Sequence, residues 1–184
     1  DYCDTFLLKE GIKPKDKLVG ILPSAAWSLK SWPIDKWNKL TEELRAVHGV
    51  KVVNLGKSGD DAFGRMVKDA ISPEVISAED TTLKQAMAII KRCDLFIGPD
   101  SSLLHLASCI GTDVIGLYGP TSNEYIYPYF HSKDCINTKE RLDCMPCYPS
   151  LKVCPCKEKK TYGTCMEHIS VDDVLDKALK RLVV

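Results

Sequence analysis

The stretch Cys93–Thr121, CDLFIGPDSSLLHLASCIGTDVIGLYGPT, decides the fold of this chain. An apolar run at Leu95–Ile97 passes through a loop at 98–102 into a short apolar segment at 103–109, and a second apolar run follows at Val114–Leu117. This order predicts a buried strand, a sharp loop, a short helix and a second buried strand. Because the amides of a first helical turn are unpaired and lie at the positive end of the helix dipole, we expect a phosphate-bearing ligand at this helix start.

Length and composition exclude several classes of protein. The chain has 184 residues, which suits one domain with a sizeable core, and 45% hydrophobic with 27% charged residues is typical of a soluble globular protein. Its 25 basic and 25 acidic residues cancel, which argues against a nucleic-acid partner held by bulk positive charge. No apolar run approaches the roughly 20 residues of a membrane helix, so we expect no membrane span. The charged start without a signal peptide indicates a segment of a longer cytoplasmic protein.

The cysteines are numerous and unevenly placed. There are nine of them, and an odd number favours a reducing compartment over a secreted disulfide scaffold. Cys93 and Cys109 stand in apolar surroundings and are expected to be buried free thiols. Six of the others crowd toward the C-terminal end of the chain, where Cys135 is followed by Cys144, Cys147, Cys154, Cys156 and Cys165.

Strands and helices also alternate along the chain before the opening stretch. Further strands are expected at 18–22, 51–55 and 75–76, and helices at 33–48, 62–71 and 83–92. Thr82 with Gln85 predicts a capping box at the start of the last of these helices. The alternation predicts an α/β fold, a Rossmann-like doubly wound parallel sheet. We expect a single domain over 1–184, with a linker helix at 1–15, an irregular cysteine-rich segment at 135–166 and a C-terminal helix at 170–183.

The expected topology brings two loops together. In open parallel sheets, ligands bind beyond the carboxyl ends of the strands, at the point where the strand order reverses. If the strand at 18–22 is central and neighbours the strand at 95–97, the loops 23–31 and 98–102 meet there. Lys30 then faces Asp100 and the start of the helix behind it, where a lysine can neutralise a phosphate.

Three residues of the opening stretch each have a structural and a functional interpretation. Asp100 and Ser101 are common helix N-caps, and Asp100 can equally accept hydrogen bonds from sugar hydroxyls. His105, between two leucines, is either a packed, hydrogen-bonded histidine or a ligand contact. The sequence alone leaves both interpretations open.

The cysteine spacing, C144-x2-C147-x6-C154-x-C156-x8-C165, fits a zinc site only in its first pair. Zinc held by Cys144, Cys147, Cys154 and Cys156, a disulfide, and reduced thiols packing an irregular loop remain alternatives. A catalytic cysteine is not expected, since no histidine is placed to activate one. No D-x-D sequence occurs anywhere, which leaves cationic side chains and helix dipoles to neutralise a diphosphate.

Three ordered elements carry a family resemblance. GPDSSLLHLASCIGTDVIGLYGPT resembles the D-[ST]-G-x-x-H-[LI]-A segment and the G-P-T loop of the heptosyltransferases, glycosyltransferase family 9, which act in bacterial lipopolysaccharide core synthesis. Pro23-Ser24-Ala25 with Lys30-Ser31-Trp32-Pro33 resembles the same family's P-G-A-x(4)-K-x-W-P element, and Cys144–Met166 resembles its cysteine-containing tail. Ser24 and Ser102 stand where the family has glycine, and Asp113 where it usually has proline.

The resemblance implies one half of a two-domain enzyme. The family has two Rossmann-like domains in the GT-B arrangement, and this chain resembles the C-terminal, donor-binding half. The other half, which carries the acceptor site and the proposed aspartate base, has no counterpart in this chain, so no catalytic residue is assigned here. By resemblance, the residues that bind the donor are Ser24, Lys30, Asp100, Ser101, Ser102, His105, Gly119, Pro120 and Thr121.

The resemblance also implies a reaction. We expect inverting, metal-independent transfer of a heptose from a nucleotide diphosphate, with ADP-heptose as the donor that the resemblance implies, to a lipid-linked lipopolysaccharide core oligosaccharide. No cofactor is implied, and the expected location is the cytoplasm, in peripheral contact with the cytoplasmic face of the inner membrane. The alternatives are a non-catalytic nucleotide-sugar-binding module and a zinc-stabilised interaction domain built on the cysteine segment.

Overall fold

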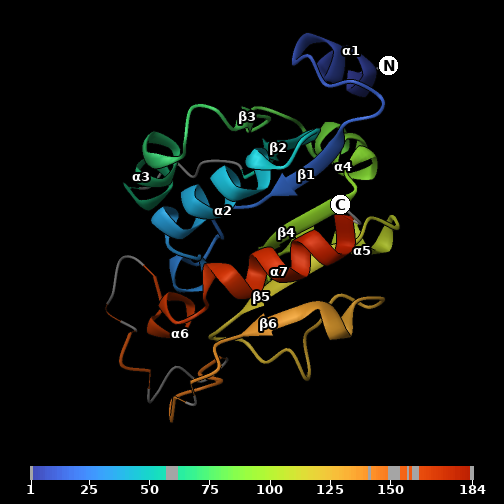
Figure 1. The fold of residues 1–184 in the computed structure, drawn as a ribbon. Helices are drawn as coiled ribbons and strands as arrows, with labels where there is room; N and C mark the ends of the chain where they lie inside the picture. The colour runs from blue at the N-terminus through green and yellow to red at the C-terminus, as the bar shows by residue number, and fades with distance from the viewer. Residues whose placement is uncertain are drawn as a thin grey trace.

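A parallel β-sheet forms the centre of the computed structural model, which describes residues 2–56, 62–140, 142–148, 154–156, 158 and 162–182. Within these residues the sheet has six strands in the order β3-β2-β1-β4-β5-β6, and every neighbouring pair is parallel (Figure 1). The strands are β1 (Lys17–Ile21), β2 (Val50–Asn54), β3 (Ile76–Ser77), β4 (Leu95–Pro99), β5 (Val114–Tyr118) and β6 (Cys135–Asn137).

Helices precede, connect and follow the strands. They are α1 (Tyr2–Lys9), α2 (Ile34–Ala46), α3 (Ala62–Ala70), α4 (Leu83–Arg92), α5 (Ser102–Cys109), α6 (Thr164–Glu167) and α7 (Val171–Leu182), with 3₁₀ turns η1 (Ser28–Lys30) and η2 (Ser132–Asp134). The predicted capping box of α4 is confirmed, because Thr82 and Gln85 bond reciprocally. None of the described helices is long and apolar enough to cross a membrane.

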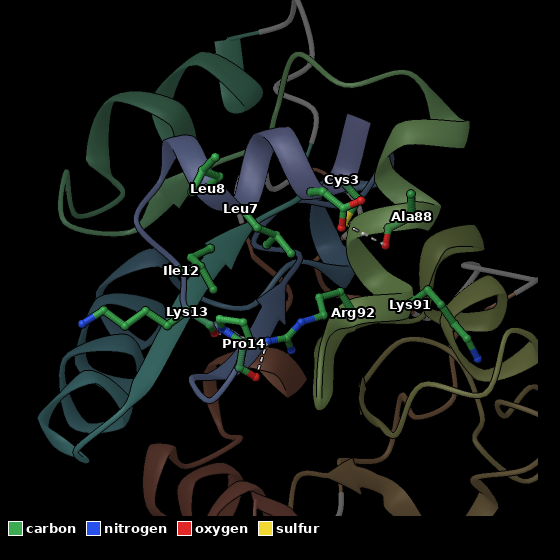
Figure 2. Close-up of a pocket in the computed structure, with 10 residues that line it drawn as sticks. Cys3, Leu7, Leu8, Ile12, Lys13, Pro14, Ala88, Lys91 and Arg92 are labelled. Carbon is green, nitrogen blue, oxygen red and sulfur yellow. Dashed lines mark hydrogen bonds between the residues drawn. The ribbon is translucent and has the colours of Figure 1, made fainter. Parts of the chain in front are cut away.

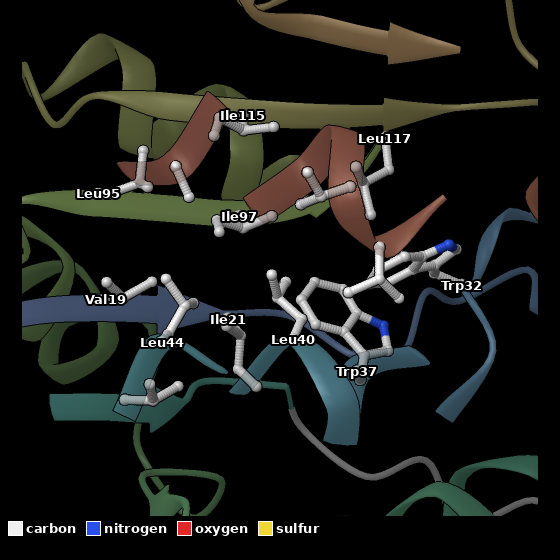
Figure 3. Packing of buried hydrophobic residues seen from close by; sticks show 14 of the residues in the cluster. Val19, Ile21, Trp32, Trp37, Leu40, Leu44, Leu95, Ile97, Ile115 and Leu117 are labelled. Carbon is white, nitrogen blue, oxygen red and sulfur yellow. The ribbon is translucent and has the colours of Figure 1, made fainter. Parts of the chain in front are cut away.

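The two faces of the sheet are both buried. Val19 and Ile21 of β1 join one core with the inner sides of α2 and α7, as Figure 3 shows, whereas Leu18 and Leu22 join a second core with α1, α4 and α5. Side chains alternate between the two faces along a strand, so a strand covered on both sides reads as one continuous apolar run. The predicted α/β, Rossmann-like doubly wound sheet is confirmed.

The strand order reverses between β1 and β4. From β1 the chain adds β2 and β3 on one side, and then crosses to add β4, β5 and β6 on the other. Ile21 pairs in register with Ile97, so β1 and β4 end side by side. The expected meeting of the loops that follow these two strands is therefore confirmed, at the place where doubly wound folds bind their ligands.

Two expectations were wrong in detail. The segment 135–166, expected to be irregular, contains β6, which extends the sheet beside β5, and the short helix α6. The sequence pattern misses β6 because it is three residues long and none of them is fully buried. Cys109 is exposed, unlike the buried Cys93, because α5 buries Leu104, Ala107 and Ser108 and turns its last residue outward.

Candidate functional site

The loop after β1 is held rigidly on the C-terminal side of Lys30. Trp32 is fully buried, and its Nε1 donates a hydrogen bond to the carbonyl of Ile169 at 3.1 Å. Its ring meets that of Trp37 edge-on, with centroids 5.1 Å apart (Figure 3). The Ser31 hydroxyl accepts a hydrogen bond from the backbone amide of Ala25 at 2.9 Å, which ties the start of the loop to its end. The tryptophan and serine of this motif therefore set the position of Lys30, the last residue of η1.

The carboxylate of Asp100 contacts two side chains, those of Lys30 and His105. Its Oδ2 accepts a hydrogen bond from Lys30 Nζ at 2.7 Å, and its Oδ1 lies 3.2 Å from Nε2 of His105. The side chain of Asp100 is 7% exposed and that of Lys30 is 20% exposed, so water screens the pair poorly. The predicted opposition of Lys30 and Asp100 is confirmed, and the structure adds His105 as a second partner.

The environment of Asp100 keeps its side chain ionised. Burial by itself raises the pKa of this carboxyl, but the hydrogen bonds from Lys30 and His105 and the positive charge of Lys30 lower it further than burial raises it. The Thr121 hydroxyl also acts to lower the pKa of Asp100, although it makes no hydrogen bond of good geometry with the described residues. The net pKa lies below the ordinary 3.8, so Asp100 is a carboxylate at neutral pH.

The start of α5 lies at the same place. Ser101 is its N-cap, in extended conformation, and its hydroxyl accepts a hydrogen bond from the Leu104 amide at 3.3 Å. The structural interpretation therefore applies to Ser101, while the Asp100 carboxylate is occupied by Lys30 and His105. Ser102, the first residue of the helix, is exposed. First-turn amides have no carbonyl partner within their own helix, so this end can hold an anion.

These groups line one cleft of about 350 Å³. Five of the predicted residues contribute to it: Lys30, Asp100, Ser101, Ser102 and His105. The residues that sequence reasoning missed are Ala25, Ala26 and Trp27, which form the other wall. Their position in the Pro23–Pro33 loop could have indicated that they line the cleft. Small residues there let a ligand approach the backbone, and an aromatic ring offers a flat surface.

The other predicted residues lie apart from this cleft. Gly119 and Thr121 line a neighbouring cavity of about 200 Å³, while Ser24 lines neither of these two cavities. The carbonyl of Pro120 accepts a hydrogen bond from the Tyr148 amide at 3.0 Å. A Cβ on Gly119 would come within 2.7 Å of the sulfur atoms of Cys165 and Met166, so a larger residue here would have to displace these side chains of α6.

The cysteine segment packs beneath the cleft. Cys147, Cys154 and Cys156 are buried in a small apolar cluster around Leu29, next to Lys30. All nine cysteines are free thiols, and among the described residues no three or more metal-ligating side chains are arranged to hold a metal ion. Burial, and then the neighbouring Cys154, raise the pKa of the Cys147 thiol to about 12. In the described part of this segment, Cys147, Cys154, Cys156 and Cys165 are buried free thiols.

A larger cavity lies at the opposite, amino-terminal edge of the strands. It measures about 740 Å³ and lies between α1 and α4, where Cys3 donates a hydrogen bond to the Ala88 carbonyl and Arg92 to the Pro14 carbonyl (Figure 2). Its walls include Leu7 and Ile12. We place the site in the smaller cleft because there a lysine, a carboxylate, a histidine and a helix start converge at the switch point of the sheet.

A serine, a histidine and an aspartate also line up near the amino end of β5. Ser108 Oγ lies 2.9 Å from Nδ1 of His131, and Nε2 of His131 lies 3.3 Å from Asp113. Ser108, however, is only 1% exposed. A nucleophile must reach its substrate, so this array holds the loop before β6 against α5 and forms no hydrolytic site.

Comparison with known proteins identifies the family of this chain. The family model of glycosyltransferase family 9 (heptosyltransferase) matches residues 5–158. Lipooligosaccharide heptosyltransferase 2 of Haemophilus influenzae is 32% identical over 117 residues, which cover 60% of this chain and 34% of that protein.

Solved structures of related fold extend over nearly the whole chain. ADP-heptose lps heptosyltransferase II of E. coli superposes with a TM-score of 0.74 at 21% identity, over 99% of this chain and 51% of that one. The iron-containing heptosyltransferase TibC, solved in complex with ADP-D-β-D-heptose, gives a TM-score of 0.69 at 17% identity, over 90% of this chain and 45% of that one. This chain spans between a third and about half of the length of these relatives. The match of the family model over most of the chain shows that the protein belongs to glycosyltransferase family 9, the heptosyltransferases.

Proposed function

We propose that this chain is the donor-binding, C-terminal half of an inverting heptosyltransferase that acts in lipopolysaccharide core synthesis. The observation that carries the proposal is the Lys30–Asp100–His105 cluster, set beside the start of α5 at the carboxyl ends of β1 and β4. Membership of the heptosyltransferase family supports the class of reaction.

The cleft suits a leaving diphosphate. During transfer the bond between the sugar's anomeric carbon and the diphosphate oxygen breaks, and its electron pair stays on that oxygen. Lys30 and the first-turn amides of α5 stabilise this negative charge, and they stabilise it more as the charge develops. Asp100 fixes the Lys30 ammonium in advance of binding, so little reorganisation is needed during the reaction. His105 and Asp100 offer polar atoms to sugar hydroxyls at the cleft wall.

We propose ADP-heptose as the donor and a lipid-linked core oligosaccharide as the acceptor. The related structures described above include one named for ADP-heptose and one solved with ADP-D-β-D-heptose, which supports the donor. The relatives are about twice as long as this chain, so the acceptor site and the catalytic base are proposed for the other half of the full-length polypeptide. We propose that heptose transfer takes place at the cytoplasmic face of the inner membrane, where such an acceptor is accessible.

The test compares two lysines in the full-length polypeptide. Lys30→Ala removes the ammonium from the cleft, and we expect heptose transfer from ADP-heptose to fall by about a hundredfold or more. Lys17→Ala is the matched control, because it removes an ion pair of similar length, 3.0 Å to Asp94, from the amino ends of the same two strands. Equal activity of Lys30→Ala and wild type would refute the proposal. Tight ADP binding by wild type without any transfer would instead indicate a non-catalytic binding module.

The same assay tests whether transfer proceeds without a metal ion bound to the diphosphate, as we propose. The chain contains no D-x-D sequence, and Lys30 already supplies a positive charge next to the helix start. We therefore expect transfer to continue in the presence of EDTA. Loss of activity in EDTA and its recovery on addition of Mg²⁺ would overturn this part of the proposal.

A further inference from the structure

Tyr148 of the cysteine segment reaches the lysine of the donor cleft. The centre of its ring lies 5.6 Å from Lys30 Nζ, with the ammonium over the ring face. The same ring lies 6.3 Å from that of Trp27, tilted by 49°, and Trp27 is itself a wall of the cleft. Tyr148 is 47% exposed, so its ring is open to solvent on part of its surface.

The surrounding segment fixes the position of this ring. The preceding residue, Cys147, is 6% exposed and packs with Cys154 and Cys156 around Leu29. The Tyr148 amide donates its hydrogen bond to the carbonyl of Pro120, which anchors the residue to the loop after β5. The backbone that leads into Tyr148 is therefore held by the elements that build the cleft.

Lys30 consequently has two attractive partners of different kinds. Asp100 carries a full negative charge, which holds the ammonium but also repels an incoming phosphate. The face of an aromatic ring attracts a cation through its quadrupole and carries no net charge. A ring can therefore hold Lys30 at the cleft without adding to the repulsion that a diphosphate meets there.

We infer that Tyr148 is a positioning residue, which keeps the Lys30 ammonium directed into the cleft while a nucleoside diphosphate takes the place of Asp100 as its partner. The inference rests on the proposed function and assigns a role in donor binding to the cysteine segment. The segment's buried thiols then serve to place Tyr148.

The first test measures ADP binding by calorimetry and the KM and kcat for ADP-heptose in the full-length polypeptide. Tyr148→Leu keeps an apolar side chain but removes the ring, and we expect ADP affinity to fall about two- to fivefold, with KM rising more than kcat falls. Tyr148→Phe keeps the ring and should bind within about twofold of wild type, whereas Tyr148→Trp should bind at least as tightly. The control is Tyr129→Leu, which changes a tyrosine that is 77% exposed and should alter nothing.

The second test asks whether Tyr148 acts through Lys30. In a Lys30→Met background, the further change Tyr148→Leu should have no additional effect on ADP affinity, since the cation is already gone. Additive losses would overturn the inference, and so would a Tyr148→Phe variant as weak as Tyr148→Leu or a Tyr148→Trp variant weaker than wild type. Failure of wild type to bind any nucleoside diphosphate would refute the proposed function. Wild-type affinity in Tyr148→Leu, with weakened binding in Lys30→Met, would refute the inference alone.

Discussion

The ammonium of Lys30 lies 2.7 Å from the carboxylate of Asp100, although the two residues are 70 positions apart in the sequence. They meet because β1 and β4 run in parallel as neighbours and end together. The amino ends of the same two strands carry a second ion pair, between Lys17 and Asp94 at 3.0 Å. That pair is exposed to water, with side chains 46% and 28% exposed, whereas Asp100 is buried at 7%. Only the pair at the carboxyl ends lines a cleft with a helix start beside it.

Asp100→Asn should lower kcat/KM for the donor by about tenfold or more in the full-length polypeptide, because the Lys30 ammonium loses its charged partner while the shape of the side chain is kept. Steady-state transfer assays measure the effect. The control is Asp94→Asn, which neutralises the aspartate at the opposite ends of the same strands and should leave kcat/KM unchanged. Activity within twofold of wild type in Asp100→Asn would show that fixing Lys30 in advance contributes little.

The lowered pKa of Asp100 predicts how its contribution to stability depends on pH. As pH falls, the unfolded chain takes up a proton at this side chain near the ordinary 3.8, before the folded protein does. The stabilisation is therefore complete above that pH and is lost as pH falls from 3.8 through the lower, folded-state pKa. Urea unfolding of wild type and Asp100→Asn between about pH 7 and pH 3 should show a free-energy difference that shrinks on acidification. A difference that grows in acid would contradict the assigned direction.

Gly163→Ala should weaken both stability and nucleotide binding. A Cβ at this position would lie 2.8 Å from the backbone carbonyl of Leu29, which cannot move without shifting Lys30. We expect the free energy of unfolding to fall by about 1–3 kcal/mol and ADP affinity to fall with it. The control is Gly11→Ala, whose positive φ of 67° makes alanine strained while nothing lies within 4 Å. It should lose about 1–2 kcal/mol and keep its ADP affinity. Similar ADP affinity in both variants would mean that the Leu29 contact does not control the cleft.

The cysteines should differ widely in their reaction with iodoacetamide. Cys109 is exposed and should be alkylated first. Burial raises the pKa of the Cys147 and Cys165 thiols to about 12, and the neighbouring Cys154 contributes to the rise at Cys147. Because few thiolates form, alkylation of these two cysteines in the folded protein should be slow. Mass spectrometry of tryptic peptides at about pH 8 follows each site, and unfolding in urea should make the rates equal. Labelling of Cys147 as fast as that of Cys109 in the folded protein would show that the cluster around Leu29 opens.

The sequence predicted a helix or strand correctly where residues within the same segment decide its structure. The apolar runs of β1, β4 and β5 identified strands buried on both faces, and Thr82 with Gln85 marked the start of α4. It failed for β6, whose three residues are incompletely buried and whose place in the sheet depends on β5. It also failed for Cys109, since the side of α5 that faces outward is set by packing against its neighbours.

The sequence by itself determined the parallel sheet and the family, and it predicted that Lys30 faces Asp100, because periodicity and short motifs record what each segment must bury or present. Only the tertiary structure decided which groups the Asp100 carboxylate contacts. Ser101 caps α5, which leaves both oxygens of Asp100 for Lys30 and His105. Only the tertiary structure, too, brought Tyr148 from the cysteine segment to the face of Lys30. Contacts between segments so far apart depend on strand order and loop packing, which no local pattern of residues encodes.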